Sequence, residues 1–267
     1  EATTRCVGML TVILAHIGNR IDHDKQADTH KGGREQRAHA IEGESHDEGL
    51  PKRDQGDLSV GHAGAIVNGV PRIGFQKGGK TAQWKDEDMA ELFLEKAKGF
   101  MKENKDKPFF LYYGLHQPHV PRVPNERFAG KSGMGPRGDV ILEADWCVTE
   151  FLKEMDKLGL TENTLVVFTS DNGPVLDDGY QDQAVELVGD HKMAGPLRGG
   201  KTSLYDGGTC IPFMLRWPAE VKPGAVSDAL VCQMDLLASL SALIGQTYSD
   251  KVDSQNTLPV FLGKGGN

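Results

Sequence analysis

The chain has 267 residues, of which 38% are apolar and 25% charged, and its formal net charge is −8. This length suits one large α/β domain or two smaller ones, and the composition is that of a globular protein. The acidic balance excludes nucleic acid as the main partner, because a phosphate backbone requires a basic face. No stretch reaches the roughly 18 consecutive apolar residues of a membrane span.

The four cysteines are far apart and form no Cys-x-x-Cys pair: Cys6, Cys147, Cys210 and Cys232. This spacing argues against a structural zinc site and against a disulfide scaffold. Cys147 and Cys210 stand among apolar neighbours, which predicts that both thiols are buried.

The N-terminal part of the chain differs from the rest. Residues 7–17 are apolar but lack a basic leader and a small-x-small cleavage site, so they predict a strand and no signal peptide. Residues 22–54 have a loop composition with almost no aliphatic side chains. We therefore expect a loop-rich segment over residues 1–60 and an α/β core over residues 61–267. Five histidines near this segment lack the spacing of a metal site and predict solvated loop residues: His16, His23, His30, His39 and His46.

Helical and strand patterns alternate from about residue 72 onward. Apolar residues at helical spacing predict helices over residues 86–103, 138–158 and 235–244. Apolar runs predict strands over residues 109–113, 164–169 and 211–217, of which the first two are typical of strands buried on both faces. The order predicts an α/β fold with a mostly parallel or mixed central sheet and helices on both faces.

Two oxygen-bearing side chains follow the apolar run at residues 164–169. These are Asp171 and Asn172, in the sequence Ser170-Asp-Asn-Gly173. Ligands of open α/β sheets bind beyond the carboxyl ends of the strands, and such oxygens suit a hard cation such as Ca²⁺ or Mg²⁺. Taken alone, Asp-Asn-Gly is more typical of an ordinary Asx-turn after a strand, and only the rest of the chain favours the cation site.

Two further loops carry polar and basic side chains. One holds His116 and His119, and a glycine-rich loop over residues 195–208 holds Arg198 and Lys201. If the strands are parallel, these loops and Asp171 gather at one edge and form a site for a tetrahedral oxyanion ester. Alternatively, Arg198 and Lys201 are solvated cations of a surface turn, and His119 is a packed structural histidine.

Several segments resemble one family when they are taken together and in order. They are Pro108-Phe-Phe-Leu-Tyr-Tyr, Pro118-His-Val-Pro121, Phe168-Thr-Ser-Asp-Asn-Gly173, Gly195-Pro-Leu-Arg-Gly-Gly-Lys201 and Pro212-Phe-Met-Leu-Arg-Trp-Pro218. Over roughly residues 61–264 the chain resembles the arylsulfatase-type sulfatases of the alkaline-phosphatase superfamily. The resemblance implies a truncated alkaline-phosphatase-like core, and the family is commonly exported.

The resemblance also implies roles for individual residues. Lys201 is similar to the lysine that grips the sulfate, and His119 to the histidine beside the scissile ester. These two are the implied catalytic residues, and with Arg198 they form the expected substrate-binding set. Asp171 and Asn172 are similar to two ligands of a single Ca²⁺. The implied substrates are sulfate esters of carbohydrates or of small aryl compounds.

Other segments of the family pattern are not found in the sequence. The family's nucleophile is a formylglycine made from Cys or Ser in Cys-x-Pro-Ser-Arg, and neither this motif nor the Ala-Asp-Asp and Gly-Lys-Trp-His segments are present. From the resemblance we also expect this chain to lack the family's small antiparallel C-terminal subdomain. We therefore expect that this chain alone does not hydrolyse an aryl sulfate.

Two alternatives to an active sulfatase remain open. One is a catalytically inactive, sulfatase-like protein that binds anions or glycans. The other is a metal-dependent phosphoesterase of the same superfamily. Phosphoesterases typically carry Asp-His where this chain has Asp171-Asn172, because zinc prefers imidazole whereas Ca²⁺ prefers oxygen. Asn172 thus favours the sulfatase branch.

Overall fold

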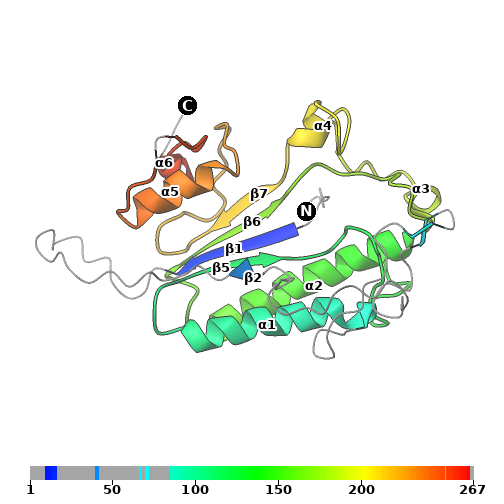
Figure 1. The fold of residues 1–267 in the computed structure, drawn as a ribbon, viewed down its shortest axis with the longest axis horizontal. Helices are drawn as coiled ribbons and strands as arrows, with labels where there is room; N and C mark the ends of the chain where they lie inside the picture. The colour runs from blue at the N-terminus through cyan, green and yellow to red at the C-terminus, as the bar shows by residue number, and fades with distance from the viewer. Residues whose placement is uncertain are drawn as a thin grey trace, which may run out of the picture.

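The computed structural model describes residues 10–16, 40–41, 66–67, 70–71, 85–249 and 251–264. Five strands form the central sheet, in the order β2-β5-β1-β6-β7 (Figure 1). They are β1 (Leu10–His16), β2 (Ala40–Ile41), β5 (Phe109–Gly114), β6 (Thr164–Ser170) and β7 (Phe213–Arg216). A separate two-stranded pair consists of β3 (Ile66–Val67) and β4 (Val70–Pro71).

Helices lie on both faces of this sheet, so the structure confirms the predicted α/β class. The two long helices are α1 (Met89–Asn104), which continues a 3₁₀ turn η2 (Asp86–Asp88), and α2 (Gly135–Lys157). The shorter helices are α3 (Ala184–Leu187), α4 (Asp206–Thr209), α5 (Asp235–Leu243) and α6 (Leu258–Phe261). None of the helices in the described ranges is long and apolar enough to cross a membrane.

The sheet is mixed, which is one of the two arrangements that the sequence predicts. β1 lies between β5 and β6 and is antiparallel to both, so β5 and β6 run in the same direction. Gly114, the last residue of β5, pairs with Thr11, and Ser170, the last residue of β6, pairs with Leu10. The carboxyl ends of β5 and β6 therefore lie at the same edge of the sheet.

β7 reverses the direction of the sheet at its border. It is antiparallel to β6, and its first residue, Phe213, pairs with Thr169 near the end of β6. We expected the glycine-rich loop to follow the carboxyl end of a strand. In the structure it instead precedes the first residue of β7. Because β7 is reversed, this loop nevertheless enters the sheet at the edge where β5 and β6 end.

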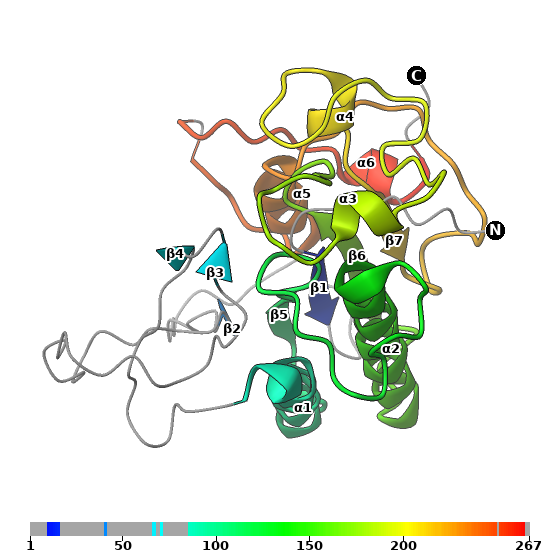
Figure 2. The same cartoon turned by 90° about the vertical axis from the view of Figure 1, so that its right-hand side faces the viewer.

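The apolar run of β1 is buried on both faces. Val12 and Leu14 belong to the core cluster that includes α1 and α2, whereas Ile13 packs with Leu236 of α5 and Phe261 of α6. Figure 2 shows the two helical layers on opposite sides of the strands. A strand between two apolar layers carries apolar side chains on both faces, which explains the run of Val12, Ile13 and Leu14. β1 comes from within residues 1–60; the proposed division at residue 60 stays a prediction.

The two long helices agree with their sequence patterns. α2 begins at Gly135, three positions before the predicted start, and Pro136 occupies its first turn, where a missing N–H breaks no helical bond. Gly159, at φ +70°, ends the helix in the left-handed conformation that favours glycine. β7 is shorter than the predicted strand over residues 211–217.

Two predictions of burial are wrong. Cys210 is exposed, because it follows the short helix α4 and precedes a strand at the border of the sheet. His16 is not a solvated loop residue: it ends β1, is buried, and its ring stacks on Phe109 with 5.2 Å between centroids. Its Nδ1 lies 2.9 Å from Thr164 Oγ1, and burial lowers the pKa of His16. The other four histidines of that group lie outside the described residues.

Glu143 of α2 fastens the segment after β5 to the helix layer. Its carboxylate accepts hydrogen bonds from Gln117 Nε2 and from the backbone N–H of Asn125, both at 3.1 Å. The side chain is almost fully buried. Burial raises the pKa of Glu143, and the two hydrogen bonds offset this only in part.

We expect the Glu143 carboxyl to make stability fall with rising pH. Its folded-state pKa is raised, so the folded protein holds the proton to higher pH than the unfolded chain does. As the pH rises from the ordinary pKa of a glutamate to the raised pKa of Glu143, the folded protein therefore loses stability. In Glu143→Gln this part of the profile should flatten, and the amide of Gln117 can turn to keep the hydrogen bond. Urea unfolding over a pH series measures the effect. Glu126→Gln, at an exposed position, is the control, and equal profiles for wild type and Glu143→Gln would contradict the assignment.

Candidate functional site

Three loops meet at the edge of the sheet where β5 and β6 end. The histidine loop (residues 115–122) follows β5, the Asp-Asn loop (residues 171–184) follows β6, and the glycine loop (residues 195–208) leads toward β7. The strand registers bring the three loops to this edge, and together they hold all the site residues that the sequence predicts.

The glycine loop is joined to the Asp-Asn loop through the backbone. The N–H of Gly173 donates to the carbonyl of Gly208 at 2.9 Å, and the N–H of Lys201 donates to the carbonyl of Pro174 at 2.7 Å. A Cβ atom at Gly173 would lie 2.0 Å from the carbonyl oxygen of Gly207, closer than any real contact. The two backbones therefore approach at a distance that only glycine permits.

The glycine loop is also closed upon itself. The N–H of Gly207 donates to the carbonyl of Arg198 at 2.8 Å, and a Cβ atom at Gly208 would lie 2.4 Å from the carbonyl oxygen of Gly200. We call these contacts, together with those of Gly173 and Lys201, the glycine junction. The junction holds the backbone of Lys201 against Pro174, which follows Asn172 by two residues in the chain. This attachment does not depend on any side-chain contact.

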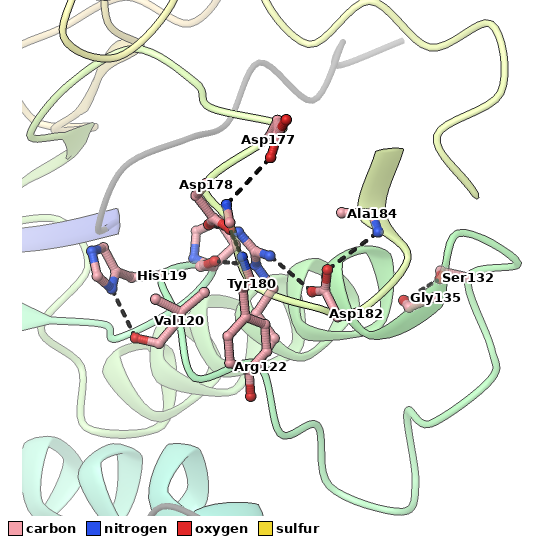
Figure 3. A network of polar contacts seen from close by, with 12 residues as sticks. His119, Val120, Arg122, Ser132, Gly135, Asp177, Asp178, Tyr180, Asp182 and Ala184 are labelled. Atoms are coloured by element: carbon pink, nitrogen blue, oxygen red, sulfur yellow. Dashed lines mark hydrogen bonds and ion pairs between the residues drawn. The ribbon is translucent and has the colours of Figure 1, made fainter. Parts of the chain in front are cut away.

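Arg122 joins the histidine loop to the Asp-Asn loop. Its side chain is 1% exposed, its Nε donates to the carbonyl of Pro118 at 3.0 Å, and its Nη1 donates to Asp182 at 2.8 Å. Its Nη2 forms a second ion pair with Asp178 (Figure 3). One guanidinium thus holds the backbone next to His119 against two carboxylates of the loop that begins with Asp171.

Tyr180 and Asp182 complete the surroundings of Arg122. The guanidinium carbon lies 5.9 Å from the centroid of the Tyr180 ring. Burial, followed by the negative charge of Asp182, raises the pKa of Tyr180. The carboxylate of Asp182 also accepts from the backbone N–H of Ala184 at 3.2 Å, which places the start of α3 beside it.

His119 is half-buried, and its tautomer follows from its hydrogen bond. Its Nδ1 lies 2.8 Å from the carbonyl oxygen of Val120. A carbonyl only accepts, so Nδ1 carries the hydrogen and the neutral ring has its lone pair on Nε2. Nε2 is therefore the ring nitrogen that this hydrogen bond leaves available to another partner.

Asp171 and Asn172 lie directly beyond β6, as the sequence predicts. Asp171 is exposed, and Asn172 is half-buried with its Nδ2 donating to the carbonyl of Gly173 at 2.8 Å. This bond turns the amide so that Oδ1 remains as the oxygen donor for a cation. Ca²⁺ takes six to eight oxygen ligands, and no group of three or more His, Cys, Asp or Glu residues in the described ranges could hold a metal ion. The described residues do not by themselves complete a Ca²⁺ site.

The predicted site residues differ in how closely the structure links them. Lys201 and Asn172 stand on segments joined by the glycine junction. His119 belongs to the same edge, but among the described residues its ring hydrogen-bonds to Val120 and to none of the other predicted site residues. Arg198 is exposed and stacks on Tyr205. Their convergence in one pocket stays a prediction.

Sequence reasoning missed the residues that hold the loops in place. Arg122 lies between two apolar neighbours, Pro121 and Val123, and nothing in a single sequence links it to acids 56 and 60 positions away. The acidic segment Asp177-Asp-Gly-Tyr180 reads as a solvated turn. The only local signal is a charged residue inside an otherwise apolar, proline-rich segment.

We expect Arg122→Met to lower the free energy of unfolding by about 3–5 kcal/mol, because it leaves the buried carboxylate of Asp182 and the mostly buried carboxylate of Asp178 without their cation. Arg127→Met is the matched control: Arg127 pairs with Glu91 at 3.2 Å with both side chains about half exposed, and it stacks over Trp146 at 4.3 Å. That change should cost about 1 kcal/mol. Urea denaturation compares the two, and equal losses would show that Arg122 does not support the fold.

The glycine junction gives a second stability prediction. Gly173→Ala should destabilise the chain by about 3 kcal/mol, at the upper end of overpacking effects, because the new methyl group meets backbone that cannot turn away. Gly99→Ala in α1 meets nothing within 4 Å and should stabilise the chain by about 0.5–1 kcal/mol. Thermal unfolding of both variants measures the contrast. A Gly173→Ala protein as stable as wild type would contradict the close approach.

Comparison with known proteins supports the resemblance and covers most of the chain. The family model described as Sulfatase matches residues 28–246. N-acetylgalactosamine-6-O-sulfatase of Bacteroides thetaiotaomicron is 55% identical over 208 residues, which cover 77% of this chain and 40% of that protein. Arylsulfatase A of Homo sapiens is 38% identical over 164 residues, covering 61% of this chain and 30% of the human protein.

Solved structures agree with the fold. A structure from work on glycosaminoglycan metabolism by Bacteroides thetaiotaomicron shares 55% identity at a TM-score of 0.70, covering 75% of this chain and 42% of that one. A structure in complex with a neocarrahexaose shares 25% identity at a TM-score of 0.56, covering 71% of this chain and 41% of that one. The chain thus spans less than half the length of these relatives. It belongs to the sulfatase family and has the α/β fold of that family, related to alkaline phosphatase.

Proposed function

We propose that this chain carries the sulfate-binding part of a sulfuric ester hydrolase whose substrates are sulfated carbohydrates. The single observation that supports this most strongly is the glycine junction, which fastens Lys201 beside the segment of Asp171 and Asn172. The relative from Bacteroides thetaiotaomicron is an N-acetylgalactosamine-6-O-sulfatase, which suggests that sugar as the substrate to consider first. We take N-acetylgalactosamine 6-sulfate as the first substrate to test.

Lys201 and His119 have different tasks in this proposal. The ammonium group of Lys201 is a compact positive charge that stabilises the charge growing on the sulfuryl oxygens. His119 donates from Nδ1 to the carbonyl of Val120, which leaves Nε2 to contact the sulfate or to assist the leaving oxygen. Arg122 keeps the histidine loop at the site without touching the substrate.

We also propose that Asp171 and Asn172 hold two positions of a Ca²⁺ site. Support comes from their oxygen donors beyond the carboxyl end of β6 and from the hydrogen bond that turns the Asn172 amide. Bound Ca²⁺ would supply positive charge for the sulfate oxygens. Asn172 also argues against the phosphoesterase alternative, because zinc sites favour imidazole at that position. An exported location belongs to the same proposal and rests on the family alone.

No cysteine of the described chain is suited to become the nucleophile. Cys147 is fully buried, and burial raises the pKa of its thiol to about 12. Cys210 and Cys232 are exposed, but Cys210 is followed by Ile-Pro-Phe-Met and Cys232 by Gln-Met-Asp-Leu, so neither begins the formylglycine motif. This observation favours a second candidate function for the chain by itself: binding of a sulfated sugar without turnover.

Titration of the purified chain with N-acetylgalactosamine 6-sulfate in the presence of Ca²⁺ tests the proposal. We expect weak binding that Lys201→Ala weakens about tenfold or more, because a hydrogen-bonded charge is lost. Lys192→Ala, at an exposed lysine outside the junction, should leave the affinity unchanged. Equal affinities for wild type and Lys201→Ala would refute the role of Lys201.

The same samples separate a binding protein from an enzyme. Neither wild type nor Lys201→Ala should hydrolyse an aryl sulfate, with or without Ca²⁺, because the family mechanism needs a formylglycine nucleophile and its motif is not found in the sequence. Turnover by wild type that disappears in Lys201→Ala would show that another residue attacks the sulfur. In that case the chain is an active sulfatase, and the proposal of binding without turnover fails.

A further inference from the structure

Arg198 forms a stacked pair with Tyr205 on the surface of the glycine loop. The guanidinium carbon lies 3.8 Å from the centroid of the Tyr205 ring. Arg198 is exposed, Tyr205 is 47% exposed, and Leu204, which precedes Tyr205 in the chain, is 98% exposed. The pair therefore faces solvent.

Stacking leaves the binding capacity of the guanidinium intact. The ring covers one face of the planar group, whereas its N–H donors point outward in the plane and match the geometry of a carboxylate or sulfate. Among the described residues no carboxylate forms an ion pair with Arg198. Elsewhere in these ranges, by contrast, Arg122, Arg127 and Arg216 all pair with acids. Arg198 is thus oriented by an aromatic ring and has its donors available.

The glycine junction fixes the position of the pair relative to Lys201. The carbonyls of Arg198 and Tyr205 accept from the N–H groups of Gly207 and Gly208, at 2.8 and 2.7 Å. Both stacking partners are therefore anchored at the base of the loop that carries Lys201. Three peptide bonds separate Arg198 from Lys201, so their Cα atoms lie no more than about 11 Å apart.

We propose that Arg198 and Tyr205 form a second anion subsite, which takes a carboxylate or sulfate on the sugar next to the one whose sulfate Lys201 binds. This inference rests on the proposed function of Lys201. Lys201 is half-buried and its backbone is bonded to Pro174, whereas the Arg198 side chain is exposed, so the two cations serve different groups of one ligand. The substrate class is then a polyanionic oligosaccharide, and not a monosulfated sugar alone.

Three ligands test the subsite on the purified chain by calorimetric titration at one ionic strength. They are N-acetylgalactosamine 6-sulfate, its disaccharide with a hexuronic acid, and the same disaccharide with the carboxyl reduced to an alcohol. Wild type should bind the acidic disaccharide about tenfold more tightly than the reduced one. Arg198→Gln should abolish this difference, and the ratio of the two disaccharide affinities measures it.

The variants of Tyr205 examine the stacking itself. Tyr205→Phe keeps an aromatic ring and should keep the preference for the acidic disaccharide, whereas Tyr205→Leu should lose most of it because the guanidinium is no longer held. Thermal unfolding confirms that each variant is folded. Lys192→Gln, at an exposed lysine, controls for a general loss of positive charge.

The outcomes distinguish this subsite from the proposed function. If Lys201→Ala weakens all three ligands but Arg198→Gln changes none of them, the function stands and the subsite is refuted. If Arg198→Gln weakens all three equally, Arg198 contacts the scissile sulfate and the subsite is likewise refuted. If wild type binds none of the ligands, the proposed function fails and the subsite fails with it.

Discussion

The buried guanidinium of Arg122 is the interaction on which the arrangement of the candidate site depends. It bonds a backbone carbonyl of its own loop through Nε and two carboxylates of another loop through its terminal nitrogens. Only the planar fork of arginine can address these partners at once, since a lysine ammonium is a point charge. Burying three charges costs solvation, and such groups often serve specificity more than stability. Here the specificity is the fixed position of the histidine loop against the Asp-Asn loop.

The glycine junction performs the corresponding task on the other side of the site by an opposite physical means. No charge is involved: Gly173, Gly207 and Gly208 allow backbones to approach where any Cβ would collide. This need follows from the reversal of β7. Because β7 is antiparallel to β6, the glycine loop enters the sheet where the Asp-Asn loop leaves it. The two backbones therefore pass so close to each other that no Cβ atom fits between them. Side chains would separate them, and Lys201 would move away from Asn172.

The sequence predicts features that arise from local periodicity, and fails where distant residues decide. The apolar run of Leu165, Val166 and Val167 predicts a buried strand, and it is unbroken because the helical layers on both faces of the sheet are apolar. The direction of β7 has no local signal, since Phe213–Arg216 would form the same pattern in either sense. Cys147 and Cys210 have similar apolar neighbours in the sequence, yet one is in a helix facing the core and the other precedes a strand at the border of the sheet. Burial of an isolated side chain is set by packing that the sequence does not display.

The net charge of −8 does not oppose an anionic ligand at this edge of the sheet. Several carboxylates are bound to internal partners: Asp178 and Asp182 form ion pairs with Arg122, and Asp139 is buried. For Asp139, burial acts to raise the pKa, but hydrogen bonds led by those from Ser132 prevail and lower it. These carboxylates face internal donors, so their field outside is weak compared with that of exposed acids. Lys201 and Arg198 form no ion pair with an acid in the described chain, so their positive charges are available to an anion although the protein as a whole is acidic.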